Sequence, residues 1–323
     1  MKITFPAILT VTALLLASCG GSAAGSSGQT KEQTGSAVSQ TEETAQQPED
    51  TTEPETTVPP DTAAQMPESV AAVSKSIGEL WLLSGGQLAG ITSDGLSLPG
   101  IGEDTVSIGT ISKPNLETIL SLSPDMVMLS EDIPSQKEIE QPLADAGITV
   151  YPVDINSFSD YEDVMKDLTG MTGREDLYKT NVTDVADRID QIKAEAADLP
   201  EASYLALRIS ATKSKALKND SFVTGVLDDL RMNNLASDTS ALNELSVEGI
   251  ANLNPDYLFV VYSGDETESE SIYNTLFASN PLWQNLTAVK NNHVFHLPKD
   301  LFQYKPNARW DEAYEYIYDI RKS

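Results

Sequence analysis

The sequence predicts an α/β protein of two similar lobes with mostly parallel sheets, joined by a long rigid α-helix. Three observations support this fold class. A helix–proline–strand unit occurs twice, buried-type apolar runs alternate with helical patterns, and one long amphipathic segment separates the two halves. The part from residue 66 to residue 323 is long enough for two medium domains.

The N-terminal residues predict export followed by lipid attachment. The apolar run 5–17 follows Lys2 and is shorter than the roughly 20 residues that span a bilayer, which is typical of a secretory signal. Leu16-Ala17-Ser18-Cys19 then resembles the bacterial lipobox, in which the cysteine becomes the lipidated first residue. Cys19 is the only cysteine, so it belongs to no disulfide framework. We expect a signal peptide over 1–18 and lipidation of Cys19; the alternative is a plain secretory peptide.

Residues 19–65 are expected to be the lipidated cysteine followed by a disordered acidic spacer. This segment is rich in Ser, Thr, Glu, Gln and Pro and contains no aromatic residue, so it cannot bury enough apolar surface to fold. Of the formal charge of −28, the spacer accounts for −7 and Lys2 for +1, which leaves −22 for the remainder. Such an acidic chain is not expected to bind nucleic acid. No second long apolar run follows.

The N-terminal lobe is predicted over residues 66–157. Its first copy of the repeat, 116–127, has a short helical stripe, Pro124 to end the helix, and a buried strand. The same alternation predicts the other elements of this lobe, which are strands at 70–73, 88–92 and 148–153 and helices at 77–83 and 135–146.

A helical linker is predicted over residues 158–200. Gly170 and Gly173 interrupt its apolar stripe, so we expect two helices, the second over 174–199. If wholly helical, the second would be about 39 Å long. A helix of that length bridges two lobes and is a poor hinge, so the lobes should close only slightly on binding.

The C-terminal lobe is predicted over residues 201–323. Its segment 247–258 repeats the pattern of 116–127: an aliphatic residue, Glu, then Ile, Leu, Pro and Asp at the same spacing. Independent use of the same helix–proline–strand pattern is the alternative to an internal repeat. The other predicted elements are strands at 204–209 and 293–297 and helices at 222–230 and 307–320.

The lipobox, the repeated Leu-Glu-x-Ile-x-x-Leu-x-Pro-Asp unit and Thr172-Gly173-Arg174-Glu175 at the start of the linking helix together resemble one family. It is the helical-backbone substrate-binding proteins of ABC importers, which carry ferric siderophores, haem or cobalamin. The resemblance covers about residues 66–323. It implies a monomeric receptor, lipid-anchored on the outer face of the cytoplasmic membrane, that delivers its small-molecule ligand to a permease dimer with its ATPase.

Candidate ligand-binding residues are basic and aromatic side chains that follow predicted strands. In open α/β sheets, ligands lie off the carboxyl ends of strands, and fixed cations there attract carboxylates or catecholates. Neighbouring aromatic rings offer flat apolar area. The alternative is that these side chains belong to a solvated charged loop and to a packed terminal helix and do not contact a ligand. The C-terminal candidates are Arg208, Lys213, Lys215, Lys218, Lys299, Phe302, Tyr304, Lys305, Arg309 and Trp310.

The N-terminal lobe contributes candidates by position alone: Lys75, Ser76, Lys113 and Glu131 match the family's cleft-facing loops. Turn or cap chemistry is the alternative for each. The resemblance also implies that the repeat's shared acids, Glu117 and Glu248, pair with arginines of the permease. Their alternative role is as helix N-terminal acids favoured by the macrodipole.

No metal site and no enzyme is predicted. His293 and His296 are the only histidines, and an offset of three in a strand places their rings on opposite faces. The sequence lacks the phosphate-loop, nucleophile-elbow and His-Glu-x-x-His motifs. We therefore expect no covalent cofactor and a ligand that is itself a metal chelate: a ferric siderophore first, haem or cobalamin as alternatives. An adhesion or scaffold lipoprotein with a flat polar surface is the alternative from another class.

Overall fold

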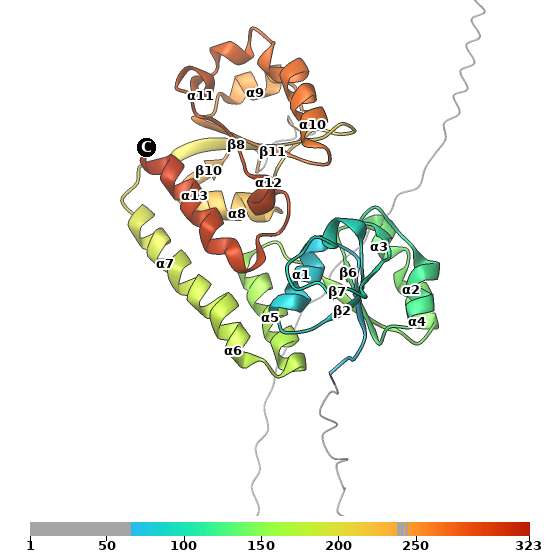
Figure 1. Cartoon of the computed structure of the whole chain (residues 1–323). Helices are drawn as coiled ribbons and strands as arrows, with labels where there is room; N and C mark the ends of the chain where they lie inside the picture. Colours follow the sequence, from blue (N-terminus) through green and yellow to red (C-terminus); the bar gives the residue numbers. More distant parts are fainter. Residues whose placement is uncertain (1–65, 238–241, 243–244) are drawn as a thin grey trace, which may run out of the picture. The chain divides into compact units, whose positions relative to one another are not determined.

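The computed structural model describes residues 66–237, 242 and 245–323, so the predicted signal peptide, Cys19 and spacer lie outside the described residues. The chain divides into one unit over Met1–Val58 and another over Pro59–Ser323, and the described residues belong to the second. They form two mostly parallel sheets with helices around them (Figure 1). The predicted α/β class is confirmed.

The N-terminal lobe is built on a five-stranded parallel sheet in the order β3-β2-β1-β6-β7. The predicted helix over 135–146 is instead two short helices. Inside one continuous helix Pro142 would break a backbone hydrogen bond, whereas in the first turn of the second helix its missing N–H costs nothing. The elements are β1 (Val70–Ala72), α1 (Lys75–Leu83), β2 (Leu88–Ile91), β3 (Val106–Ser107), the pair β4 (Gly109–Thr110) and β5 (Lys113–Pro114), α2 (Leu116–Leu122), β6 (Met126–Ser130), α3 (Pro134–Lys137), α4 (Glu140–Asp145) and β7 (Thr149–Val153).

The C-terminal lobe has a sheet in the order β10-β8-β11-β12, parallel except for β9, which pairs antiparallel with β8. The predicted last helix begins with a 3-10 turn at Asn307–Arg309 before it becomes α-helical. The elements are β8 (Ala202–Ile209), β9 (Lys215–Ala216), α8 (Phe222–Asp229), β10 (Met232–Asn234), α9 (Val247–Leu253), β11 (Tyr257–Tyr262), α10 (Glu266–Tyr273), α11 (Thr287–Lys290), β12 (Val294–His296), α12 (Lys299–Phe302) and α13 (Trp310–Lys322).

The two copies of the repeat have the same local structure. Each helix, α2 or α9, ends at a left-handed residue, Ser123 (φ 46°) or Asn254 (φ 44°), just before the proline. The aspartate that follows binds the beginning of the neighbouring strand. Asp125 accepts two backbone N–H groups at 2.8 and 2.9 Å, and Asp256 accepts the N–H and hydroxyl of Ser203 at 2.9 and 2.7 Å. The repeat therefore sets strand order and helix end in both lobes.

Two helical segments join the lobes, as predicted. Helix α5 (Phe158–Thr172) begins with a capping box at Ser157 and ends at Gly173, whose φ of 68° favours glycine. A continuous helical stretch follows: α6 (Glu175–Tyr178), a π-helical turn η2 (Lys179–Thr183) and α7 (Asp184–Ala196). It is about 33 Å long, slightly shorter than predicted. Helix α7 lies beside α13, and Arg188 forms a 2.6 Å ion pair with Glu315 (Figure 1).

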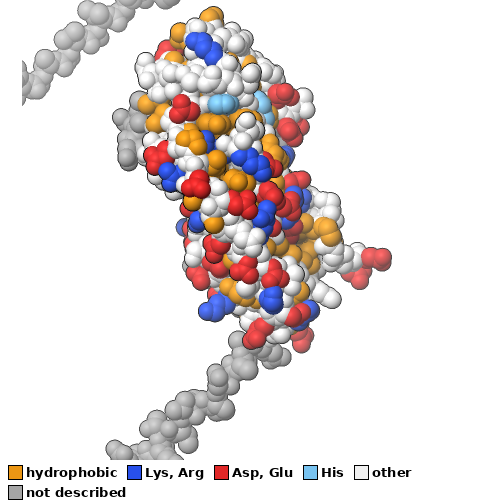
Figure 2. Space-filling view, turned by 90° about the vertical axis from the view of Figure 1, so that its left-hand side faces the viewer, with side chains coloured by type: hydrophobic (Ala, Val, Ile, Leu, Met, Phe, Trp, Pro, Cys, Tyr) orange, Lys and Arg blue, Asp and Glu red, His pale blue; other side chains and the backbone are white. Residues whose placement is uncertain are grey.

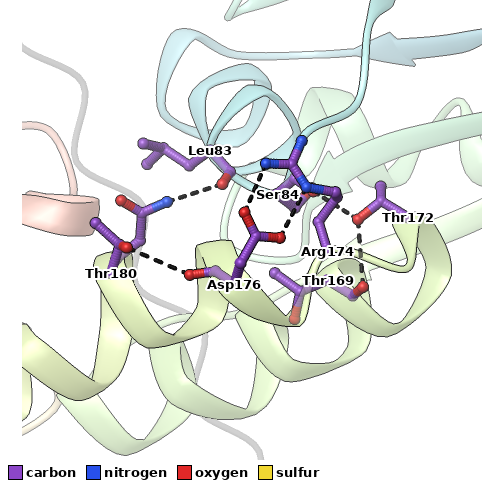
Figure 3. Close-up of polar contacts among 8 residues, drawn as sticks. Leu83, Ser84, Thr169, Thr172, Arg174, Asp176 and Thr180 are labelled. Carbon is purple, nitrogen blue, oxygen red and sulfur yellow. Dashed lines mark hydrogen bonds and ion pairs between the residues drawn. The ribbon is translucent and has the colours of Figure 1, made fainter.

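The C-terminal end of α1 is hydrogen-bonded to residues at the end of α5 and in the π-helical turn before α7. The last carbonyl groups of a helix have no partner within the helix. Here Thr172 donates its hydroxyl to the carbonyl of Ser84 at 2.5 Å, and Asn181, in the π-helical turn, donates its amide to the carbonyl of Leu83 at 2.8 Å (Figure 3). Side chains of both linker segments thus attach the linker to the N-terminal lobe by donating hydrogen bonds to the last carbonyl groups of α1.

One apolar core continues from the N-terminal lobe through the linking helices into the C-terminal lobe, with Trp81, Met165, Ile189 and Ile317 among its buried members. On the surface, acidic side chains are interspersed with basic ones over the face shown in Figure 2. Among the described helices, none is both long enough and apolar enough to span a bilayer.

Candidate functional site

A pocket of about 530 Å³ lies between the two lobes. It is formed where β1, β6, β7 and β8 end, because the residues just after or at those carboxyl ends line it. The loop between α12 and α13 lines it as well. The polar lining residues are Ser74, Ser76, Ser130, Asp132, Asn156, Arg208, Lys215, Asp220, Ser221, Gln303, Tyr304, Lys305 and Asn307.

Two cations lie directly opposite each other on paired strands. In the antiparallel β8–β9 pair, Arg208 is the partner of Lys215, so both side chains point to the same face, and both line the pocket. Like charges directly opposite each other destabilise a sheet. Burial lowers the pKa of Arg208, and its Nε is buried with no hydrogen-bond partner within the described structure. An anion in the pocket would relieve both conditions.

A third cation, Lys305, crosses from the C-terminal to the N-terminal side of the pocket. Its Nζ donates to the carbonyl of Ile155 and lies 3.5 Å from Oδ1 of Asn156. The side chain is 27% exposed. Burial lowers its pKa, and the nearby Arg208 lowers it further. Three basic groups therefore converge in a chain whose net charge is −28.

Two carboxylates share the pocket with these cations. Asp132 lies 4.0 Å from Nζ of Lys305, and Asp220 lines the opposite lobe. Both act on Arg208 by partly offsetting the lowering of its pKa by burial. The pocket is thus lined by three cations and by two carboxylates that can accept hydrogen bonds.

The structure brings five of the fourteen sequence-predicted ligand residues to the pocket: Ser76, Arg208, Lys215, Tyr304 and Lys305. Tyr304 also lies under Lys75, whose Nζ is 5.3 Å from the ring centroid, and under Lys299, at 5.8 Å. Lys299 donates to the carbonyl of Gly264. The other candidates outside the lining are Lys113, Glu131, Lys213, Lys218 and Arg309, the last being paired with Glu312 at 2.9 Å.

Two predicted aromatic ligand residues belong to the core instead. Phe302 is 0% exposed and packs against Tyr316, so its ring offers no surface to a ligand. Trp310 is 1% exposed and meets Phe158 and Phe222 edge-on. It lines a separate cavity of about 440 Å³ between α5, α7, α8 and α13. An aromatic residue after a strand reads the same in the sequence whether it packs inward or faces a cleft.

Several lining residues gave no signal in the sequence. Gln303 and Asn307 are uncharged residues between α12 and α13, while Asp132 and Asp220 are two acids in an acid-rich chain. Ligand residues are expected just after the carboxyl ends of strands, and the turn after β6 does line the pocket. The lining residue in this turn is Asp132, the neighbour of the predicted Glu131.

The remaining candidates lie away from the pocket. Glu117 and Glu248 are exposed in the first turns of α2 and α9, at equivalent positions of the repeat. The two histidines have different surroundings. His293 stacks on Tyr257 with ring centroids 4.3 Å apart, whereas His296 packs against Tyr262 and Tyr273.

Known proteins resemble this chain in sequence. It is 28% identical to the iron-uptake system-binding protein of Bacillus subtilis over 191 residues, 58% of this chain and 59% of that protein. It is 29% identical to the Fe(3+)-citrate-binding protein YfmC of the same species over 214 residues, 63% of this chain and 62% of that protein. The chain thus spans less than two thirds of the length of these two curated relatives.

The fold is also that of a solved structure, Staphylococcus aureus IsdE complexed with heme, with a TM-score of 0.70 and 19% identity over 79% of this chain and 99% of that one. A family model described as periplasmic binding protein matches residues 70–301, which contain both copies of the repeat and most of the pocket lining. This is a family of substrate-binding proteins, not enzymes, in agreement with the sequence. The chain belongs to the periplasmic binding protein family.

Proposed function

We propose that this protein captures an anionic metal chelate, a ferric siderophore or a related ferric complex, in the pocket between its lobes and delivers it to the permease of an ABC importer. The single observation that carries the proposal is the convergence of Arg208, Lys215 and Lys305 in one pocket. The relatives named for iron uptake and ferric citrate support the same ligand class. A surface scaffold, in contrast, has no use for such a pocket.

Electrostatics favour an anion over a neutral ligand. The acidic surface repels anions, while the pocket's cations attract them, so the field directs an anionic chelate toward its site. Haem, with two propionates, is the second candidate, and the fold shared with IsdE supports it. Cobalamin is a weaker candidate, because its chemistry offers fewer anionic groups to pair with the three cations.

Binding to the purified full-length protein tests the proposal. Tryptophan fluorescence is titrated with ferric citrate, an amide-linked ferric tris-catecholate, haem and cyanocobalamin, each at low and high salt. We expect a ferric anionic chelate to bind and its affinity to fall with salt, because screening weakens charge attraction. Tight binding of cobalamin alone, insensitive to salt and to Arg208→Ala, would overturn the anionic-ligand proposal.

Delivery is proposed to use Glu117 and Glu248, one exposed acid on each lobe, as contacts for a two-fold symmetric permease. Both residues lie outside the pocket lining. Reversing both charges to lysine should reduce uptake in cells and leave the dissociation constant of the purified protein unchanged. A collapse of affinity would instead assign them to the binding site or to folding.

Lipidation of Cys19 is proposed to hold the receptor on the outer face of the cytoplasmic membrane. Metabolic labelling with a palmitate analogue should mark the wild-type protein and not Cys19→Ala. Equal labelling of both would contradict anchoring through this cysteine without affecting the proposed ligand.

A further inference from the structure

The inter-lobe pocket offers hydrogen-bond acceptors as well as cations. Asp132 on the N-terminal side is 53% exposed and remains 4.0 Å from Lys305, beyond hydrogen-bond distance. Asp220, in the loop before α8, is exposed on the C-terminal side. A ligand that only accepts hydrogen bonds would meet repulsion from both carboxylates, which reduces the attraction of Arg208 and Lys215.

Asn307 adds an acceptor whose orientation is fixed. This residue is 0% exposed, and its amide nitrogen donates to the carbonyl of Ser76 at 3.0 Å and to Oε2 of Glu79 at 2.6 Å. Because both partners can only accept, the nitrogen must face them, and the amide cannot be flipped. Its Oδ1 is buried with no partner among the described residues, and the side chain lines the pocket. A buried acceptor without a donor is costly.

We propose that the ligand is an anionic chelate that also carries N–H or O–H donors, and that Asp132 and Asp220 select it over anions that only accept hydrogen bonds. This inference rests on the proposed function and defines its ligand class more narrowly. The cations bind the anionic groups, while the two carboxylates and Asn307 Oδ1 accept the donors. Discrimination then has two sources, attraction of the correct ligand and repulsion of the wrong one.

The test compares two probes on two matched variants by isothermal titration calorimetry. The probes are an amide-linked ferric tris-catecholate, which carries N–H donors, and haem, whose propionates only accept at neutral pH. Asp132→Asn removes the pocket carboxylate. Glu138→Gln makes the same charge change at an exposed residue of the same lobe that does not line the pocket. Because Asp132 is half exposed, its variant should fold, which circular dichroism verifies.

We expect Asp132→Asn to weaken tris-catecholate binding roughly tenfold, because the amide oxygen that replaces the carboxylate is a weaker, uncharged acceptor, and to leave haem binding unchanged or stronger. Glu138→Gln should change neither. If Asp132→Asn strengthens binding of both probes, the carboxylate is only repulsive and the inference is wrong while the proposed function stands. If neither probe, nor ferric citrate, binds the wild-type protein, the proposed function is wrong and the inference is overturned with it.

Discussion

Replacing Arg208 by glutamine should weaken binding of an anionic ferric chelate strongly without destabilising the fold. Gln keeps much of the side-chain length and removes the charge. Arg208 is half-buried, and its Nε has no hydrogen-bond partner among the described residues. The ligand-free protein therefore already bears the free-energy cost of burying this group. Losing one partner of a buried charge pair costs about 2–5 kcal/mol, which corresponds to roughly 30- to 4000-fold in affinity. We expect the lower part of this range, because Lys215 and Lys305 remain.

The assay is a calorimetric titration of the variant and of Arg309→Gln, which removes a cation that is paired with Glu312 outside the pocket. Arg309→Gln should bind as the wild type does. Urea unfolding should show equal or greater stability for Arg208→Gln, because burial of an unpartnered donor is relieved. Unchanged affinity of Arg208→Gln, or equal losses in both variants, would refute the assignment of the pocket as the anion site.

Three further outcomes are expected. Phe302→Ala should lower the free energy of unfolding by about 3–5 kcal/mol in urea titrations, as for a core aromatic, whereas Tyr304→Ala should mainly lower ligand affinity; the reverse pattern would place Phe302 in the cleft. Hydrogen bonds from Ser203 lower the pKa of Asp256, so the stability that this carboxylate contributes should be present at neutral pH and lost as pH falls through the lowered pKa. Equal pH dependence of unfolding in Asp256→Ala and in the wild type would contradict this. Small-angle scattering with and without bound chelate should differ only slightly, and a large compaction would mean that the linking helix bends.

The fold could be read from the sequence because its determinants are local and repeated. The two Pro-Asp units and the buried apolar runs fix the inner strands β6 and β11. Gly173 ends α5 where predicted, whereas Gly170, also predicted to interrupt the helix, lies within it. The alternation of strands and helices predicts only one helix over 135–146 and does not reveal its division into α3 and α4.

The site was only partly predictable. Arg208, Lys215 and Lys305 stood out because cations are rare in this chain and follow strands. Asn307 could not be identified, since its role depends on a left-handed backbone (φ 51°) and on partners more than two hundred positions earlier. The sequence does not distinguish a core Phe302 from a ligand-facing one, because local sequence does not say which way a ring points.

The π-helical turn Lys179–Thr183 determines where a change in the length of the linking helix alters the orientation of the C-terminal lobe. A π turn holds one residue more than an α turn, so deletion of one residue within it restores regular pitch and keeps α7 in register with α13. An added residue within α7 instead turns everything that follows by about 100°. That rotation would carry Arg208 and Lys305 away from Asp132 and the strand ends of the first lobe. Deletion of one residue within the π turn should therefore be tolerated, whereas an insertion within α7 should abolish binding.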